Sequence, residues 1–307
     1  MLLWFGRFHL SRVDAFREFP YGNEYAKQVF TKTRFNELYA CFHLVDNEKV
    51  PDKTKKQDAF WQIRPLIETL QTTFVKHFVP FWGLSIDEMT TPFKGKSRAK
   101  QYNPSKPNKW GFKDFALCCA KTGYCLFFYP YQGKDAQRSG DMSLAEFAVR
   151  AVLLPVFFHS NYHLAMDNWF TCWGAVAFIM GVGVQLVATL RSGRKGFPST
   201  SMTDISSSEA RGTCKVFGHR VHPLYVVAWL DNKLVRLVTT LPFGIGTCLR
   251  GVKDGTWQII TIAQPQLIGC YNALMGGCDK SDQHKAYIRP VIRSRVRMRP
   301  PVTPIVT

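Results

Sequence analysis

Two aspartates stand at the ends of short apolar runs, LSID ending at Asp87 and LAMD ending at Asp167. An ionised carboxylate at the end of a buried strand is costly unless it lies in a cleft, pairs with a cation or binds a metal ion. Taken alone, either aspartate is more often a cap, a turn residue or an ion-pair partner. The shared design of the two segments makes both candidate metal ligands.

A third candidate, Asp279, lies in the segment YNALMGGCDKSDQ. Gly276 and Gly277 permit a close backbone approach where a helix starts, and Asp282 follows one turn later on the same face. Three carboxylates from distant parts of the sequence could therefore converge.

Converging carboxylates suit Mg²⁺ or Mn²⁺, which prefer oxygen ligands, and carboxylate number does not choose between the two ions. In a two-metal site, one ion activates a water or a 3′-hydroxyl and the other stabilises the leaving oxygen of a phosphate. This chemistry requires neither a histidine nor a nucleophilic serine.

The elements that must position these residues alternate between strands and helices. Strand-like runs at 83–87, 112–120, 124–131, 163–167 and 184–191 are joined by a hairpin turn at 121–123 and by helical patterns at 142–158 and 173–181. The order strand, hairpin, helix, strand, helix, strand predicts a mixed α/β fold.

The flanking regions have different textures, which predict five segments. Residues 1–80 are predicted to be a helical region and residues 81–191 the first part of the core. Residues 192–223 form a Ser- and Gly-rich insertion that extends in its widest version to about residue 255. Residues 256–289 form the last part of the core, and residues 290–307 a basic Pro/Arg tail. A hairpin around Asn232 joins 224–231 to 233–241, and 270–288 has a helical pattern.

A segment that follows Asp87 is strongly basic. Residues 94–113 contain seven Lys or Arg and no acid, interleaved with aromatic residues, and Pro104 and Pro107 would keep the chain extended. A charge run is usually only a solvated face, but this position favours a loop that contacts phosphates. The predicted DNA-binding residues of the segment are Lys94, Lys96, Arg98, Lys100, Tyr102, Lys106 and Lys109.

A second group of DNA-binding candidates surrounds Asp167 and the strand after it. Arg191, Arg194 and Lys195 could contact phosphates, and Asn168 could contact a phosphate or orient a ligand. Trp169 could stack on a splayed base or, with equal weight, belong to the core. His219 and His222 do not predict zinc, because no histidine or cysteine pair lies at a complementary spacing.

The composition favours a polyanionic partner. The 307 residues include 40 Lys or Arg and 22 Asp or Glu, giving a formal charge of +18. Nucleic acid is the first candidate partner and an anionic membrane surface the second. The hydrophobic share of 46% excludes disorder as the default state.

The cysteines and apolar runs argue against export and membrane insertion. Nine cysteines without a CxxC pair are typical of reduced thiols, and the N-terminus gives no secretory signal. The apolar run 174–190 contains three glycines and a glutamine, so a buried helix, a glycine turn and a buried strand explain it better than a membrane span.

Three quoted regions resemble the motif regions of piggyBac-type transposases, in the same order: IDEMTTPFKGKSRAKQYNPSKPNKWGFK, MDNWFT and YNALMGGCDKSDQ. The segments ATLRSGRKGFP and AWLDNKLVRLVTT also resemble family segments, and FNELYACFHLVDNE does so more loosely. The main resemblance covers roughly residues 80 to 285.

The resemblance implies a ribonuclease H-like fold interrupted by an insertion. It also implies cut-and-paste transposition at TTAA sites through a hairpin intermediate, with double-stranded DNA as partner and two divalent ions. The family triad falls on Asp87, Asp167 and Asp279, with Asp282 at an additional acidic position. By this resemblance, residues 1–80 would be part of a helical dimerisation or DNA-binding region, and a homodimer is expected if that region is intact. Nuclear localisation is expected from the DNA partner and the basic tail.

The sequence also departs from the family pattern. Family members have a longer N-terminal region, more helix after the third aspartate and often a cysteine-rich zinc module, which is not seen in this chain. Three hypotheses stay open: an active metal-dependent transposase, a truncated or domesticated DNA-binding remnant without catalytic activity, and an unrelated basic globular protein.

Overall fold

The computed structural model describes residues 31–93, 95–104, 109–133, 140–254 and 256–288. The chain forms two compact units, one made of residues 1–68 with 283–307 and the other of residues 69–282. We call them the small unit and the main unit and describe each separately.

The described part of the small unit is helical, as the sequence predicts. It contains α3 (Lys32–Cys41), α4 (Asp52–Gln57), the 3₁₀ helix η2 (Trp61–Ile63) and the start of α5 (Arg64–His77). Arg64 donates two hydrogen bonds of 2.7 Å to the Asp58 carboxylate, which fixes the chain on both sides of η2.

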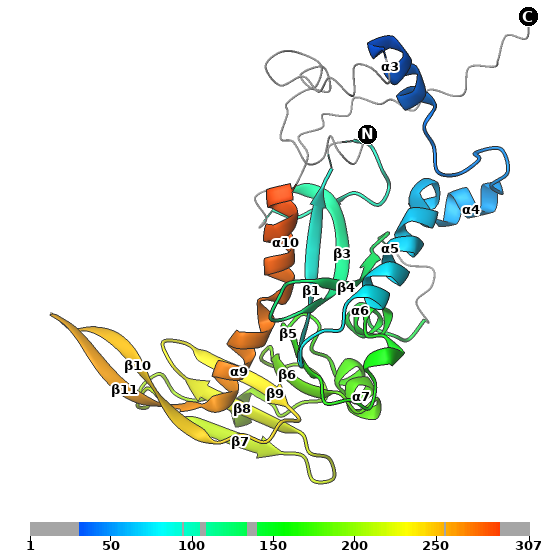
Figure 1. The fold of residues 1–307 in the computed structure, drawn as a ribbon. Coiled ribbons are helices and arrows are strands. Elements are labelled where there is room, and N and C mark those ends of the chain that lie inside the picture. Colours follow the sequence, from blue (N-terminus) through cyan, green and yellow to red (C-terminus); the bar gives the residue numbers. More distant parts are fainter. Residues whose placement is uncertain (1–30, 94, 105–108, 134–139, 255, 289–307) are drawn as a thin grey trace, which may run out of the picture. The chain divides into compact units, whose positions relative to one another are not determined.

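The main unit contains a nine-stranded mixed sheet in its described residues, with the order β2-β3-β1-β5-β6-β9-β8-β7 and β4 paired to β3 (Figure 1). β1 pairs antiparallel with β3 and parallel with β5, which pairs parallel with β6. β6 then pairs antiparallel with β9. The strands are β1 (Gly83–Pro92), β2 (Gln101–Tyr102), β3 (Trp110–Cys119), β4 (Cys125–Pro130), β5 (His163–Met166), β6 (Gln185–Thr189), β7 (Cys214–Gly218), β8 (Tyr225–Leu230) and β9 (Leu234–Thr239).

One face of the sheet carries α6 (Leu144–Val152), the 3₁₀ helix η3 (Pro155–Phe157) and α7 (Trp173–Gly181). Alternate strand residues, among them Ile86 and Met166, pack there with the apolar sides of α6 and α7 in the main core cluster. Ser143 caps α6 by accepting a 3.1 Å hydrogen bond from the Glu146 amide.

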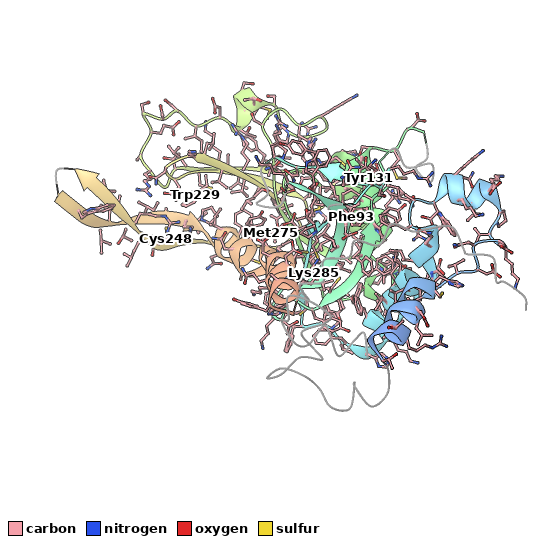
Figure 2. All side chains as sticks on the ribbon, turned by 90° about the horizontal axis from the view of Figure 1, so that it is seen from above. Phe93, Tyr131, Trp229, Cys248, Met275 and Lys285 are labelled. Atoms are coloured by element: carbon pink, nitrogen blue, oxygen red, sulfur yellow. The ribbon has the colours of Figure 1, made fainter. Side chains whose placement is uncertain are left out.

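The other face carries α9 (Gln266–Met275) and α10 (Gly277–Ile288), which follow one another with only Gly276 between them. A second core cluster joins Ala165 and Val187 of the sheet to Leu267 and Leu274 of α9. Figure 2 labels three contributors to this region, Trp229 of β8, Cys248 and Met275. The predicted helix over 270–288 is thus present as two helices, the first of which begins at Gln266.

A long two-stranded hairpin, β10 (Ile245–Asp254) and β11 (Thr256–Pro265), leads directly into α9 (Figure 1). The sequence TWQIITIA of residues 256–263 predicts a strand, which β11 confirms. β10 was not predicted, because its residues IGTCLRGVKD mix glycines and charges with few apolar residues. Cys248 and Ile262 pack into the second cluster, and Arg250 lies over the Trp229 ring, 5.8 Å from its centroid.

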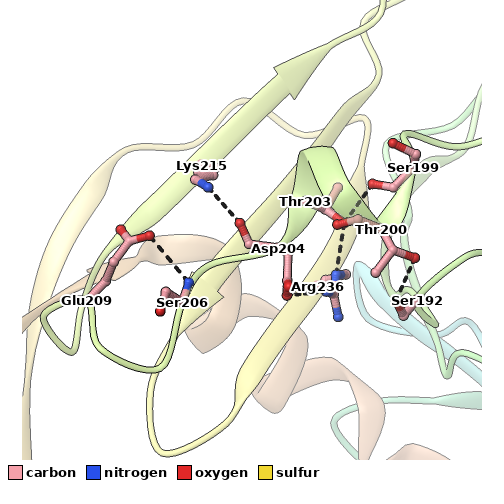
Figure 3. A network of polar contacts seen from close by, with 9 residues as sticks. All are labelled: Ser192, Ser199, Thr200, Thr203, Asp204, Ser206, Glu209, Lys215 and Arg236. Atoms are coloured by element: carbon pink, nitrogen blue, oxygen red, sulfur yellow. Dashed lines mark hydrogen bonds and ion pairs between the residues drawn. The ribbon is translucent and has the colours of Figure 1, made fainter.

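The segment 192–223 contains α8 (Thr200–Thr203) and β7, and polar contacts fasten it to β9 (Figure 3). Arg236 donates to the Thr203 hydroxyl at 3.0 Å and pairs with Asp204 at 3.3 Å, while Lys215 donates to the Asp204 carbonyl at 2.6 Å. The boundaries of the predicted insertion remain a prediction.

The apolar run 174–190 folds as predicted, with α7 followed by Gly183 at φ +66° and the buried strand β6. Among the described helices, none is long and apolar enough to cross a membrane. All nine cysteines are free thiols, and Cys41 is exposed.

Candidate metal and DNA site

Strand register places the first two candidate aspartates side by side. Ile86 of β1 pairs with Met166 of β5, so Asp87 and Asp167 are the next residues along two neighbouring parallel strands. Met166 pairs in turn with Ala188 of β6, which places Thr189 beside Asp167. Because adjacent strands are about 4.8 Å apart, the three side chains form a row across the sheet, at the carboxyl ends of β5 and β6 and in the middle of β1.

The row points toward α9 and α10. Leu84 and Ile86 belong to the main cluster on the α6 and α7 face, whereas Ser85 contacts Cys278 of α10. The period of two therefore places Asp87 on the same face as Ser85. Asp167 follows Ala165, which packs against α9 in the second cluster, and it faces the same side.

Both carboxylates are partly exposed and held by local hydrogen bonds. Asp87 Oδ1 accepts from the Glu88 amide and Asp167 Oδ1 from the Trp169 amide, each at 2.7 Å. The Thr171 hydroxyl donates to the Asp167 carbonyl at 2.9 Å and fixes the turn after β5. These contacts orient each carboxylate.

Glu88 belongs to the opposite face of β1. It pairs with Lys113 at 2.5 Å, and the Lys113 ammonium lies 4.5 Å from the centroid of the Trp169 ring. Glu88 is therefore a partner of Lys113 and lies apart from the aspartate pair.

Tyr271 of α9 faces this row. Burial raises the pKa of Tyr271, a hydrogen bond from the Thr189 hydroxyl opposes that shift, and the charges of Asp167 and Asp87 raise the pKa further. Tyr271 and Thr189 were missed by sequence reasoning. The signal available was the spacing of Leu267, Tyr271 and Leu274, which places all three on one helix face.

The third candidate, Asp279, lies in the first turn of α10 and is exposed. Its neighbour Cys278 is buried and lies over the sheet, with Sγ 3.6 Å from the carbonyl oxygens of Ser85 and Ala116. Gly277 packs against Ser85 and Ala120, where a Cβ would collide. Asp282, one turn after Cys278, is half-buried.

Strand register brings two of the three predicted ligands together, while Asp279 projects from the covering helix. Within the described ranges, no three His, Cys, Asp or Glu side chains are grouped closely enough to hold one metal ion.

The basic segment continues from β1 beyond the aspartate row. Pro92 pairs with Gly111, so the segment starts about 17 Å along the strand from Asp87. Tyr102 and Trp110 form a cross-strand pair with centroids 4.8 Å apart, and each is about half exposed. Lys100 donates to the Gly95 carbonyl at 2.8 Å and lies over Trp110. Lys96, Arg98 and Lys109 are exposed, whereas Lys94 and Lys106 lie outside the described residues.

The residues of the second group of DNA-binding candidates, around Asp167 and after β6, have different roles. Arg194 is half-buried, and its Nη2 donates to the carbonyls of Asn168 at 2.6 Å and Trp169 at 3.1 Å. Arg194 thus braces the turn that follows Asp167. Arg191, Lys195 and Asn168 are exposed.

Trp169 packs against the main core cluster. Its ring lies 5.6 Å from Phe115 and 4.8 Å from Phe170, with both distances measured between centroids. Of the two interpretations of Trp169 that the sequence leaves open, these contacts favour the core residue.

Comparisons with known proteins agree with this architecture. The family described as Transposase IS4 matches residues 1–301. Human PiggyBac transposable element-derived protein 3 is 28% identical over 289 residues, which cover 89% of this chain and 46% of that protein. Human PiggyBac transposable element-derived protein 2 is 24% identical over 269 residues, covering 85% and 44%. The chain spans about half the length of these relatives.

A solved structure shows the same fold. The cryo-EM structure of the piggyBac transposase synaptic complex with hairpin DNA superposes with a TM-score of 0.76 at 24% identity, covering 93% of this chain and 58% of that one. The predicted ribonuclease H-like mixed α/β fold is confirmed. The chain therefore belongs to the Transposase IS4 family, and its predicted resemblance to piggyBac-type transposases is confirmed.

Proposed function

We propose that this chain is the catalytic part of a DNA transposase that cleaves and transfers DNA strands by cut-and-paste transposition at TTAA sites. The observation that carries the proposal is the position of Asp87 and Asp167 as neighbours, each directly after the paired residues Ile86 and Met166 of two adjacent parallel strands. Hydrolysis and transfer of phosphodiesters need such paired oxygen ligands and need no nucleophilic side chain. The TTAA target rests on the family resemblance alone.

Asp87 and Asp167 fit a divalent cation in both chemistry and placement. They supply only oxygen donors, which Mg²⁺ and Mn²⁺ prefer, and both are partly exposed. When bound, the ions would activate the attacking oxygen and stabilise the leaving oxygen. Asp279 fits in chemistry, and we propose that it completes the ligand set, with Asp282 as a further acidic residue.

The rest of the site would position the DNA. Lys96, Arg98 and Lys109 are exposed beyond the end of β1 and would contact phosphates, as would Arg191 and Lys195 beside the second aspartate. Arg194 would keep the Asp167 turn in place through its bonds to the turn's carbonyls. The +18 charge favours binding that weakens as salt rises.

A second candidate function is DNA binding without cleavage, by a truncated or domesticated transposase. One observation favours it: among the described residues, the exposed Asp279 is not grouped with the other two aspartates. A homodimer and nuclear localisation belong to either proposal and are tested by the mass of the purified protein in solution and by microscopy of a tagged chain.

The deciding experiment incubates a TTAA-containing duplex with the purified chain and Mg²⁺ or Mn²⁺, and records nicking and binding in the same tubes. Asp167→Asn removes a candidate ligand, and Asp141→Asn, an exposed aspartate elsewhere, is the matched control. Metal-dependent nicking that is lost only in Asp167→Asn supports the transposase. Salt-sensitive binding without nicking supports the remnant, and a chain that does neither refutes both.

A further inference from the structure

Four aromatic rings form a row at the surface of the main unit. The ring centroids of Phe197 and Trp173 are 5.9 Å apart, those of Trp173 and His219 are 6.1 Å apart, and those of His219 and His222 are 5.0 Å apart. They come from the loop after β6, the first residue of α7 and the turn between β7 and β8. We call this set the ring row.

The ring row is open to solvent along most of its length. Trp173 is 38% exposed, and His219 and His222 are exposed, while Phe197 packs against the main core cluster. The imidazole of His219 is fixed, because its Nδ1 lies 3.2 Å from the amides of Val221 and His222. The row is therefore anchored at one end and presents ring faces at the other.

The surroundings of the row are basic. Arg191, Lys195 and Arg220 are exposed, and in the described part of the chain none of them forms an ion pair. The stretches 188–203 and 212–230, which supply most of this surface, contain no Asp or Glu. A polyanion with flat, exposed faces complements such a surface.

The row is connected to the aspartate site by one loop. Arg194 of this loop binds the carbonyls of Asn168 and Trp169, directly after Asp167. Two residues later, Gly196, at φ +89°, packs so closely on Trp173 that a Cβ would lie 3.0 Å from the Trp173 Cβ. One loop therefore contacts both the turn after Asp167 and the ring row.

We propose that the ring row binds the unpaired bases of a DNA strand by stacking, with Lys195 and Arg220 contacting the backbone. Only unpaired bases qualify, because bases inside a duplex already have both faces stacked, whereas any unpaired base offers a face to an aromatic ring. The presence of such a strand at this place rests on the proposed function, while the binding itself does not.

The test measures binding of a single-stranded oligonucleotide that contains 2-aminopurine. Fluorescence anisotropy gives the affinity, and the intensity of 2-aminopurine fluorescence reports stacking. Wild-type protein should quench the fluorescence. Trp173→Leu and His222→Ala should each weaken single-strand binding by about tenfold and reduce quenching, since one stacked base contributes about this much. The matched control is Trp257→Leu, which removes a tryptophan that is 76% exposed on β11 and should leave both signals unchanged.

Two further measurements separate stacking from charge and from folding. Arg220→Gln should reduce the slope of log affinity against log salt by about one and leave quenching of the bound strand intact. His222 is at the exposed end of the row, so His222→Ala carries the test alone if Trp173→Leu does not fold. Unchanged quenching in His222→Ala, or an equal loss of affinity for a fully paired duplex of the same sequence, would overturn the proposal.

Different outcomes would refute the stacking proposal and the proposed function. A wild-type chain that does not nick DNA but stacks the labelled strand would refute cleavage and retain the ring row. Metal-dependent nicking by the wild-type chain, combined with unaltered single-strand binding by His222→Ala, would support cleavage and refute the ring row.

Discussion

Arg194 offers the sharpest test of how the second aspartate is held in place. Its Nη2 donates to two carbonyls of the turn after β5, at 2.6 and 3.1 Å, from a half-buried position. A hydrogen bond from a charged group contributes about 1.5–3 kcal/mol, and here one nitrogen serves both acceptors beside solvent. Arg194→Gln should therefore destabilise the turn by about 2 kcal/mol, which is roughly a 30-fold increase in its opening.

Amide hydrogen exchange measures that opening directly. The amides of residues 168–172 should exchange roughly 30-fold faster in Arg194→Gln, whereas amides of β1 should change little. Arg191→Gln is the matched control, because Arg191 lies three residues earlier in the same loop and is exposed. If both variants accelerate exchange equally, or if neither does, the bracing role of Arg194 is wrong, and Arg194 would keep only the phosphate contact predicted from the sequence.

Three other perturbations test the packing around the site. Ser143→Ala removes the α6 cap and should lower the free energy of unfolding by about 1 kcal/mol in urea titrations. Burial raises the pKa of Asp231, but hydrogen bonds from Arg250 and Arg211 outweigh it, so the pKa is lowered. Asp231→Asn should therefore destabilise the protein by about 1–2 kcal/mol at pH 7, and the difference from wild type should vanish as pH falls below the usual aspartate range, where wild-type Asp231 is also protonated. Gly277→Ala should destabilise the main unit by about 1–3 kcal/mol, because its Cβ would collide with Ser85 and the backbone of Ala120.

Much of the main unit could be predicted from the sequence because its pattern is local. The strands β1, β5 and β6 are short apolar runs, and α7 and β6 share one apolar stretch divided by glycines, so period and turn residues identify them. Because Asp167 ends an apolar run, its position directly after β5 could also be predicted, whereas β1 continues beyond the predicted end at Asp87 to Pro92. That the two strands are neighbours in parallel register is a tertiary fact without a local signal.

Other features could not be predicted because their cause is distant in the sequence. β10 has little strand pattern of its own and is stabilised by pairing along its whole length with β11. Tyr271 looks like one more apolar position of a helix, and only the packing of α9 over the strand ends shows that it faces the aspartates. Likewise, Arg194 belongs to a basic motif that suggests phosphate contacts. In the structure its guanidinium instead donates hydrogen bonds to the carbonyls of Asn168 and Trp169, which lie 26 and 25 residues earlier in the chain.

The three acidic positions are fixed by two different kinds of constraint. Asp87 and Asp167 are placed by strand register, which cannot shift by one residue without turning the buried strand residues outward. Asp279 is placed by the seat of α10 on the sheet, where Gly277 and Cys278 meet Ser85. Gly277→Ala should therefore displace Asp279 and leave the other two in register. If the transposase proposal holds, this variant should lose metal-dependent nicking while amide protection in β1 and β5 persists, and loss of protection in those strands would contradict the separation.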